Sequence, residues 1–197
     1  KRRAKSNPGS KRKFANGNSR FSKMVVFHYA LLFLKEYCSP EAHPGPAKYF
    51  LNDYQQFLSE RKNKKVVFTN GCFDLLHKGH FFLLHEAKKK CDFLVVGLNS
   101  DSSIKSLKGP KRPVENQILR SNKLSEIEDV NAISIFDSLT PEEMIKKIKP
   151  DILIKGNDYR REEIVGSKYV IENGGSVELV ELLPGFSTTK IIQENLK

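Results

Sequence analysis

The stretch His77-Lys78-Gly79-His80 joins an apolar run and its polar turn, Val66–Phe68 and residues 69–74, to a segment with helical character, Phe81–Lys90. This order of strand, glycine-containing turn and helix N-terminus is typical of an anion site, because free backbone N–H groups and the positive end of the helix dipole converge there. Two imidazoles three residues apart can both donate hydrogen bonds to one phosphate group. The stretch therefore predicts a nucleotide phosphate site, and two unrelated surface histidines are the plain alternative.

Apolar segments alternate with helical patterns from residue 64 onward. This alternation predicts a parallel sheet with helices on both faces and with Val66–Phe68 in a central strand. Ligands of such sheets bind outside the carboxyl ends of the strands, so we expect the turns 69–77 and 155–159 and the segment Asn99–Lys108 at one edge of the sheet. The expected strands are 65–69, 93–98, 132–136, 151–155 and 176–182, and the expected helices are 79–90, 116–128, 140–148, 161–173 and 188–196.

The basic charge of the chain is concentrated in its first 23 residues. The whole chain carries a formal net charge of +11, but residues 1–23 hold nine Lys or Arg and no acidic residue. The rest is nearly neutral, with 25 basic and 23 acidic residues. A basic segment with few apolar residues predicts a disordered tail. Its plain interpretation is a solvated extension, and the alternatives are contact with nucleic acid or an anionic membrane, or a targeting segment.

Residues 24–63 predict a helical extension before the α/β domain. The apolar stretch Met24–Leu34 has 11 residues, too few to span a bilayer, so we expect a short helix packed on the domain and no membrane insertion. Three prolines in Ser39–Pro46 indicate a linker. Ala47–Arg61 then predicts an amphipathic helix that contributes aromatic side chains to the core. The core-facing residues of this helix would be Phe50, Tyr54, Phe57 and Leu58.

The cysteines and the remaining histidines show no pattern for metal binding or thiol chemistry. Three cysteines without a Cys-x-x-Cys pair fit a reducing compartment, and we expect a cytoplasmic protein. Cys72 lies in the polar turn, where we interpret it as a small packing residue. The spacing of the other histidines to carboxylates and thiols fits no zinc site, so no protein metal site is expected. These histidines are His28, His43 and His85.

Residues 69–80 resemble the signature of the cytidylyltransferase-like nucleotidyltransferase superfamily, and more narrowly that of the adenylyltransferase domain of bacterial ADP-heptose synthases. The similarity runs without obvious gaps from about Lys64 to Ile192, and several motifs in the right order are more specific than one. It implies a Rossmann-like nucleotidyltransferase domain over residues 64–197. The further motifs are Asn99-Ser100-Asp101, Leu107-Lys108-Gly109, Arg112-Pro113-Val114, Lys155-Gly156-Asn157-Asp158-Tyr159, Gly166-Ser167-Lys168, Asn173-Gly174-Gly175 and Ser187-Thr188-Thr189.

The resemblance implies transfer of AMP from ATP to D-glycero-β-D-manno-heptose 1-phosphate, giving ADP-heptose and pyrophosphate. Such a transfer depends on positioning and charge stabilisation, and Mg²⁺ is expected with the ATP rather than in a carboxylate cage. The expected catalytic residues are His77, His80, Lys105 and Lys108, of which the lysines could instead be merely solvated. The expected nucleotide-binding residues are Thr69, Asn70, Gly71, Cys72, Phe73, Asn99, Asp101, Gly156, Asp158, Tyr159, Ser187, Thr188 and Thr189. Arg112 and Arg120 are expected at a phosphate of the sugar or of ATP.

Two departures from the family pattern leave the substrate open. Ile118 and Leu119 precede Arg120 where similar proteins often carry an acidic residue and Gln, and Asn157 replaces a second glycine. A cytidylyltransferase using CTP with glycerol 3-phosphate or another phospho-alcohol is the enzymatic alternative. A non-enzymatic protein that binds nucleic acid through the basic tail is the other. Many relatives are fused to a ribokinase-like sugar kinase, so we expect a separate kinase to supply the sugar phosphate, and a homodimer is one expected assembly.

Overall fold

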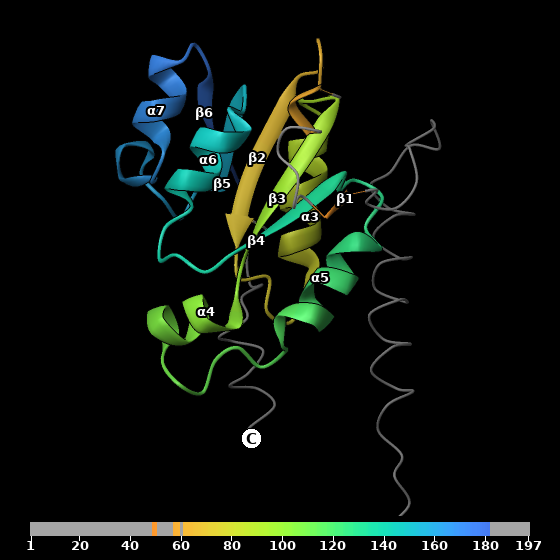
Figure 1. Cartoon of the computed structure of the whole chain (residues 1–197), viewed down its shortest axis with the longest axis vertical. Helices are drawn as coiled ribbons and strands as arrows, with labels where there is room; N and C mark the ends of the chain where they lie inside the picture. Colours follow the sequence, from red (N-terminus) through yellow and green to blue (C-terminus); the bar gives the residue numbers. More distant parts are fainter. Residues whose placement is uncertain (1–48, 51–56, 60, 182–197) are drawn as a thin grey trace, which may run out of the picture. The chain divides into compact units, whose positions relative to one another are not determined.

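The apolar run after Lys65 forms strand β2 (Val66–Gly71), an interior strand of a parallel sheet. The structure is a computed structural model that describes residues 49–50, 57–59 and 61–181. Within these residues the sheet has six strands in the order β1-β4-β3-β2-β5-β6, and every neighbouring pair is parallel (Figure 1). The predicted parallel sheet and the central position of Val66–Phe68 are therefore confirmed. The other strands are β1 (Tyr49–Phe50), β3 (Phe93–Asn99), β4 (Ala132–Phe136), β5 (Ile152–Gly156) and β6 (Ser176–Val180).

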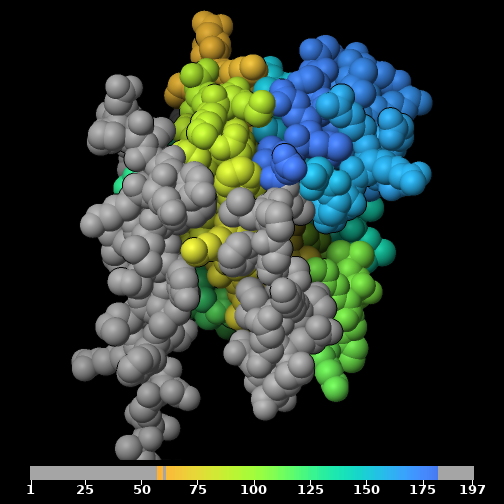
Figure 2. Space-filling model, turned by 180° about the vertical axis from the view of Figure 1, so that it is seen from behind, coloured from red at the N-terminus to blue at the C-terminus, as the bar shows by residue number. Residues whose placement is uncertain are grey.

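Helices cover both faces of the sheet, as the alternating pattern predicts. Side chains of β2 alternate between two cores: Val66 and Phe68 lie in one cluster, and Val67 lies in the other. Figure 1 shows α6 and α7 on the first side and α3 and α5 on the second. In Figure 2, seen from behind, blue residues of the last part of the described chain lie beside yellow-green residues. Lys90, which follows α3, forms an ion pair with Glu178 of β6 at 2.7 Å. The helices are α3 (Lys78–Lys88), α4 (Asp101–Lys108), α5 (Gln117–Ser125), α6 (Glu142–Ile148) and α7 (Ser167–Glu172).

The predicted helix over 47–61 is wrong at its start. Tyr49 and Phe50 form the edge strand β1, which pairs with Ala132 and Ile133 of β4. Aromatic residues favour strands where a partner strand is within reach, and no local pattern reveals that partner. The core position predicted for Phe57 is confirmed, because it is 4% exposed and its ring centroid lies 5.4 Å from that of Phe93.

Two further differences concern the segments around the carboxyl ends of β3 and β5. Residues 101–108 form helix α4, where only an edge segment was expected, and Ser100 caps it by accepting a bond from Ser103 N at 3.1 Å. The predicted helix 161–173 is divided into a 3₁₀ turn, η1 (Arg161–Glu163), and α7. Gly166 separates them at φ 87°, a left-handed conformation that interrupts a right-handed helix.

The predicted basic tail 1–23, most of the extension 24–63 and the predicted helix 188–196 lie outside the described residues. Among the residues that the structure does describe, no helix is both long and apolar enough to cross a membrane.

Candidate active site

The strands β2 and β5 are neighbours in the sheet, and the strand order switches between them. The strands β3 and β4 follow β2 on one side, and β5 and β6 lie on its other side. Pairing of β2 with β3 continues to Gly71, whereas pairing with β5 is limited to Val67 and Phe68. Both strands run on beyond that point, so their last residues are no longer held together by a sheet ladder. This switch is the place where sheets of this kind bind ligands.

The two predicted histidines lie together at the start of α3, beside this switch. His77 is the N-cap residue, and its ring stacks on that of His80 with 3.8 Å between centroids and 21° between planes. The ring of Phe73 packs against His80 with a centroid distance of 5.2 Å. The Nδ1 atoms of both histidines are buried and have no hydrogen-bond partner among the described residues. Buried polar atoms are normally paired, so this arrangement is suited to receive a polar ligand.

Burial sets the charge of the pair. It lowers the pKa of His77, and it lowers the pKa of His80 to about 3, with a smaller contribution from the charges of His77 and Lys108. Both imidazoles are therefore neutral at neutral pH, and each can donate one hydrogen bond. The predicted residue Lys108, in the last turn of α4, is thus close enough for its charge to contribute to the lowered pKa of His80. Lys105 is exposed on the same helix.

The turn after β2 brings further predicted residues to the site. Thr69 is fully buried, and its Oγ1 and the Oδ1 of Asn70 have no hydrogen-bond partner among the described residues. A Cβ on Gly71 would lie 3.3 Å from the ring of Phe73, so a larger side chain would press on that ring. Phe73 itself has φ 44°, an uncommon value for a non-glycine residue. Such strain is typical of turns held in place for binding.

Asp74 links this turn to residues 112–115 and was not among the predicted site residues. Its carboxylate is 1% exposed and accepts hydrogen bonds from the backbone N–H groups of Val114 (2.9 Å) and Glu115 (3.0 Å). The predicted residue Arg112 donates to it through Nε at 2.9 Å and forms an ion pair with it at 2.7 Å. An aspartate three residues before His77 is the sequence signal that could have identified it. The guanidinium of Arg112, expected to bind a substrate phosphate, is thus paired with a protein carboxylate in the structure.

Arg120 is also occupied by protein groups. Its side chain has no exposed surface and donates to Cys72 O (2.6 Å), Glu115 O (2.9 Å) and Asp101 Oδ1 (2.8 Å). Contact with a substrate phosphate would require the guanidinium to leave these partners. The structure brings Arg120 and Asp101 to the turn after β2, and the predicted phosphate contact of Arg120 stays a prediction. Asn99, also predicted, is 4% exposed and donates to Ser103 Oγ at 3.0 Å.

The turn after β5 supplies Gly156, Asp158 and Tyr159 at the same edge of the sheet. Lys155, which sequence reasoning gave no role, donates from Nζ to Asn70 O at 2.7 Å and lies 5.2 Å from the ring centroid of Tyr159. Burial lowers its pKa to about 8. A lysine near the end of the otherwise apolar strand β5 is the signal that could have drawn attention to it.

The remaining predicted residues and groups stay predictions. Ser187, Thr188 and Thr189 lie outside the described residues. Within the described part of the chain, no three His, Cys, Asp or Glu side chains gather to hold a metal ion, and Mg²⁺ carried by ATP remains an expectation. Cys72 is a free, partly buried thiol, and burial raises the pKa of Cys91 to about 11, which makes Cys91 unreactive.

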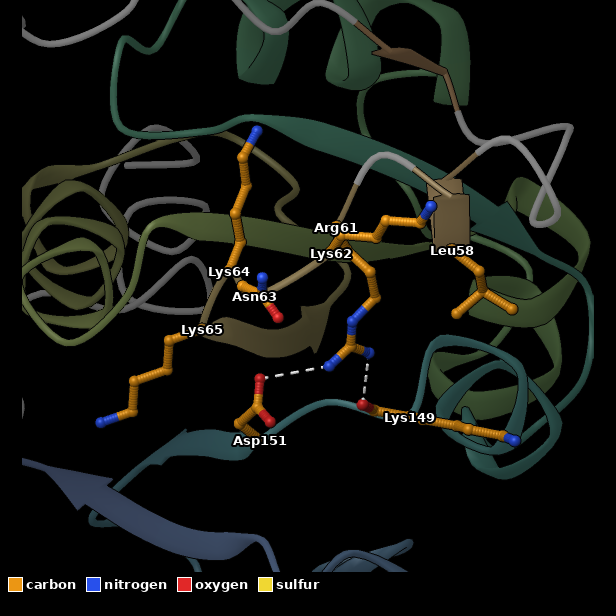
Figure 3. A pocket seen from close by; sticks show the side chains of 8 residues that line it. All are labelled: Leu58, Arg61, Lys62, Asn63, Lys64, Lys65, Lys149 and Asp151. Atoms are coloured by element: carbon orange, nitrogen blue, oxygen red, sulfur yellow. Dashed lines mark hydrogen bonds and ion pairs between the residues drawn. The ribbon is translucent and has the colours of Figure 1, made fainter.

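A pocket at the other end of the sheet does not contain these residues (Figure 3). It lies beside the amino ends of β2 and β5, and Arg61 contacts Lys149 O at 2.6 Å and Asp151 Oδ2 at 3.2 Å there. The guanidinium of Arg61 and the carboxylate of Asp151 thus already form an ion pair there. The lining residues are Leu58, Arg61, Lys62, Asn63, Lys64, Lys65, Lys149 and Asp151.

A family model described as cytidylyltransferase-like matches residues 68–194, more than half of the chain. The chain belongs to this family. The resemblance inferred from residues 69–80 is thereby confirmed. The described part of the cytidylyltransferase-like domain contains the stacked histidines, the turn after β2 and the turn after β5.

Curated relatives share the same part of the chain. The bifunctional protein HldE of Rhodopseudomonas palustris strain BisB5 is 49% identical over 134 residues, which are 68% of this chain and 27% of the relative. HldE of Paramagnetospirillum magneticum is 52% identical over 134 residues, 68% of this chain and 28% of the relative. HldE of Caulobacter vibrioides is 46% identical over 157 residues, 78% of this chain and 32% of the relative. The chain thus spans about a quarter to a third of the length of these relatives.

A solved structure has a similar fold. It is the crystal structure of the lipopolysaccharide core biosynthesis protein from Thermoplasma volcanium GSS1, with a TM-score of 0.52 and 28% sequence identity. The similarity covers 61% of this chain and 98% of that protein.

Proposed function

We propose that the chain is a nucleotidyltransferase that transfers AMP from ATP to D-glycero-β-D-manno-heptose 1-phosphate and releases pyrophosphate. The observation that carries this proposal is the stacked, neutral pair His77 and His80 at the start of α3, beside the switch in strand order. Membership in the cytidylyltransferase-like family supports the reaction class. The similarity to HldE and to a lipopolysaccharide core biosynthesis protein supports a sugar phosphate as the acceptor.

The chemistry requires no nucleophile from the protein. A phosphate oxygen of the sugar attacks the α-phosphorus of ATP, the bond from that phosphorus to the oxygen bridging to the β-phosphate breaks, and pyrophosphate leaves. His77 and His80 donate hydrogen bonds to phosphate oxygens on which negative charge develops, together with backbone N–H groups of the turn Asn70–Phe73. Lys105 and Lys108 add positive charge from α4. Mg²⁺ bound to the triphosphate neutralises part of its charge.

Because the histidines are neutral before substrate arrives, they can donate without first losing a strong ionic partner. Donors that are already in place need no reorganisation when the transition state forms, and this preorganisation is the main source of rate in such sites. Asp74 and Arg120 support the same turn from within the protein. The site therefore offers donors on one side of the switch and a turn that is fixed in position.

We expect a separate sugar kinase to supply the acceptor, because phosphoryl transfer to the anomeric hydroxyl gives a sugar 1-phosphate. We place the reaction in the cytoplasm, where ATP and free thiols are maintained. A homodimer is one expected assembly.

Pyrophosphate release tests the proposal most simply. Initial rates would be measured with ATP and with CTP, each against heptose 1-phosphate and against glycerol 3-phosphate, with Mg²⁺ present. We expect turnover with ATP and heptose 1-phosphate. Turnover with CTP alone would instead support the cytidylyltransferase alternative.

A further inference from the structure

Lys155 bridges the two strands at the point where their pairing has ended. The last paired residues of β2 and β5 are Phe68 and Leu153, and the same register would place Asn70 opposite Lys155. No ladder contact between the strands remains there, and the Nζ of Lys155 instead donates to the carbonyl oxygen of Asn70 at 2.7 Å. A side chain thus takes over from the sheet ladder at the entrance to the nucleotide turn.

The surroundings of this ammonium group are defined on each side. Burial opposes its charged form most strongly, and Asp158 of the turn after β5 and, more weakly, Cys72 of the turn after β2 favour it. The ring of Tyr159 lies 5.2 Å from Nζ. On β6 the residue paired with Lys155 is the apolar Leu179. Lys155 is therefore a cation placed between two turns whose residues were expected to bind nucleotide.

A neutral donor would be sufficient to satisfy the carbonyl of Asn70. A buried ammonium is costly unless its charge has a use, because desolvation disfavours the charged form. The nearest expected use is the triphosphate, which is strongly anionic and is expected at the turn that Lys155 holds. An ammonium with one bond to Asn70 O also keeps two further N–H donors.

We propose that Lys155 positions the nucleotide-binding turn through Asn70 and contributes a positive charge that favours binding of a nucleoside triphosphate. This inference rests on the proposed function, in that it assumes a nucleotide at the same site. It assigns to Lys155 a role that is separate from those of His77 and His80, since it acts before chemistry, on the affinity for the nucleotide.

The charge of Lys155 can be titrated without a mutation. Its pKa is about 8 in the free protein, whereas lysines with ordinary values titrate near 10.4 and a triphosphate is fully ionised above about pH 7.5. Among the lysines, raising the pH from about 7.5 to about 9.5 thus affects mainly this charge, and the same titration of Cys72→Ser removes the thiol of the turn as a second source of pH dependence. We expect the Kd of the wild-type chain for Mg·ATP, measured by calorimetry, to rise about tenfold over this range.

Two variants and a control separate charge from structure. Lys155→Met should bind Mg·ATP about tenfold more weakly at pH 7.5 and show little further change up to pH 9.5. Lys155→Arg keeps its charge throughout this range, so its Kd should stay near the wild-type value and also be independent of pH. Lys168→Met removes an 86% exposed lysine of α7 and should behave like the wild type.

Several results would overturn the proposal. A wild-type Kd that does not change with pH would exclude the charge, even if Lys155→Met fails to fold. A folded Lys155→Met chain with wild-type affinity and pH dependence would exclude Lys155 itself. The titration is repeated with CTP. If only the Kd for CTP depends on pH and on Lys155, the base is wrong and the residue is right. If neither Kd depends on them, the residue is wrong. If the wild type releases pyrophosphate but Lys155→Met binds Mg·ATP like the wild type, only this inference is contradicted. If the Kd of the wild type depends on pH but no turnover occurs, only the proposed reaction is contradicted.

Discussion

His77 and His80 form the contact on which the proposed chemistry depends, with 3.8 Å between their ring centroids. A neutral donor fixed in place stabilises negative charge that develops on a phosphate more than charge that is already present. We therefore expect His80→Ala to lower kcat about 10²–10³-fold and to change the KM for ATP much less. His77→Ala should have a similar effect.

Steady-state kinetics on folded variants would measure this, with Lys168→Met as a surface control. An unchanged kcat with a raised KM would show that the histidines bind only the ground state. Wild-type values for both constants in His80→Ala would remove the residue from the mechanism.

The depressed pKa values of the two histidines also predict a pH dependence of stability. Below about pH 6.5 the unfolded chain binds protons at these positions, whereas folded His80 stays neutral down to about pH 3. The unfolded state therefore binds more protons, and the free energy of unfolding falls as the pH drops below 6.5. The slope approaches about 1.4 kcal/mol per pH unit for a fully affected histidine. Urea unfolding near pH 7, 6 and 5 measures it, and His80→Asn should flatten the curve; an identical slope in that variant would contradict the assignment.

At the level of elements, Asp74 joins the turn after β2 to the segment before α5. Its buried carboxylate accepts from Val114 N, Glu115 N and Arg112. Asp74→Ala would leave the cation of Arg112 and two backbone donors without their partner, and should cost about 3 kcal/mol or more of unfolding free energy. Chemical denaturation gives this value. Glu143→Ala, which removes an exposed ion pair with Lys146, should change it by less than about 1 kcal/mol, and equal effects of the two changes would contradict the account.

Helix α7 depends on the glycine at its start. Gly166 has φ 87°, and an added Cβ would lie 2.4 Å from Cδ1 of the fully buried Ile145. Gly174, after the same helix, has φ 82° but no atom within 4 Å of such a Cβ. Gly174→Ala should therefore lower the free energy of unfolding by about 1–2 kcal/mol, because alanine must adopt a left-handed conformation. Gly166→Ala should lower it by about 1–3 kcal/mol more, because the added methyl group overpacks the core. Thermal melting compares the pair, and a Gly174→Ala chain that is the less stable of the two would refute this explanation.

Sequence patterns predicted the elements whose causes are local. Apolar runs located β2 and β3, because burial leaves a pattern of apolar residues in the sequence. The His77–His80 stretch located the start of α3, because residues at a helix start differ from those inside the helix. The edge strand at Tyr49–Phe50 depends on a partner more than 80 residues away, which no local pattern shows. The contact of Lys155 with Asn70 O was missed for the same reason, since it joins residues that are 85 positions apart in the chain. Arg120 was expected at a phosphate, which stays a prediction, whereas its contacts with Cys72 and Asp101 are brought about by the fold and left no local signal.

At the scale of the whole molecule, the basic tail and the catalytic body should act independently. Residues 1–23 hold nine basic residues, and the rest of the chain is nearly neutral. We expect a chain without residues 1–23 to keep its kcat for pyrophosphate release. If the chain instead works by binding nucleic acid through the tail, the deletion should abolish a salt-sensitive affinity for nucleic acid. In that case neither the full chain nor the shortened chain should release pyrophosphate.

The central claim is that AMP is transferred to a heptose phosphate at the His77–His80 site. Phosphorus NMR of a reaction with ATP, Mg²⁺ and D-glycero-β-D-manno-heptose 1-phosphate would test it directly, because the product contains two coupled diphosphate resonances beside free pyrophosphate. We expect these resonances for the wild-type chain and none, over the same reaction time, for a folded chain that carries both His77→Ala and His80→Ala. Product formation only with CTP, or equal product formation by the double variant, would contradict it.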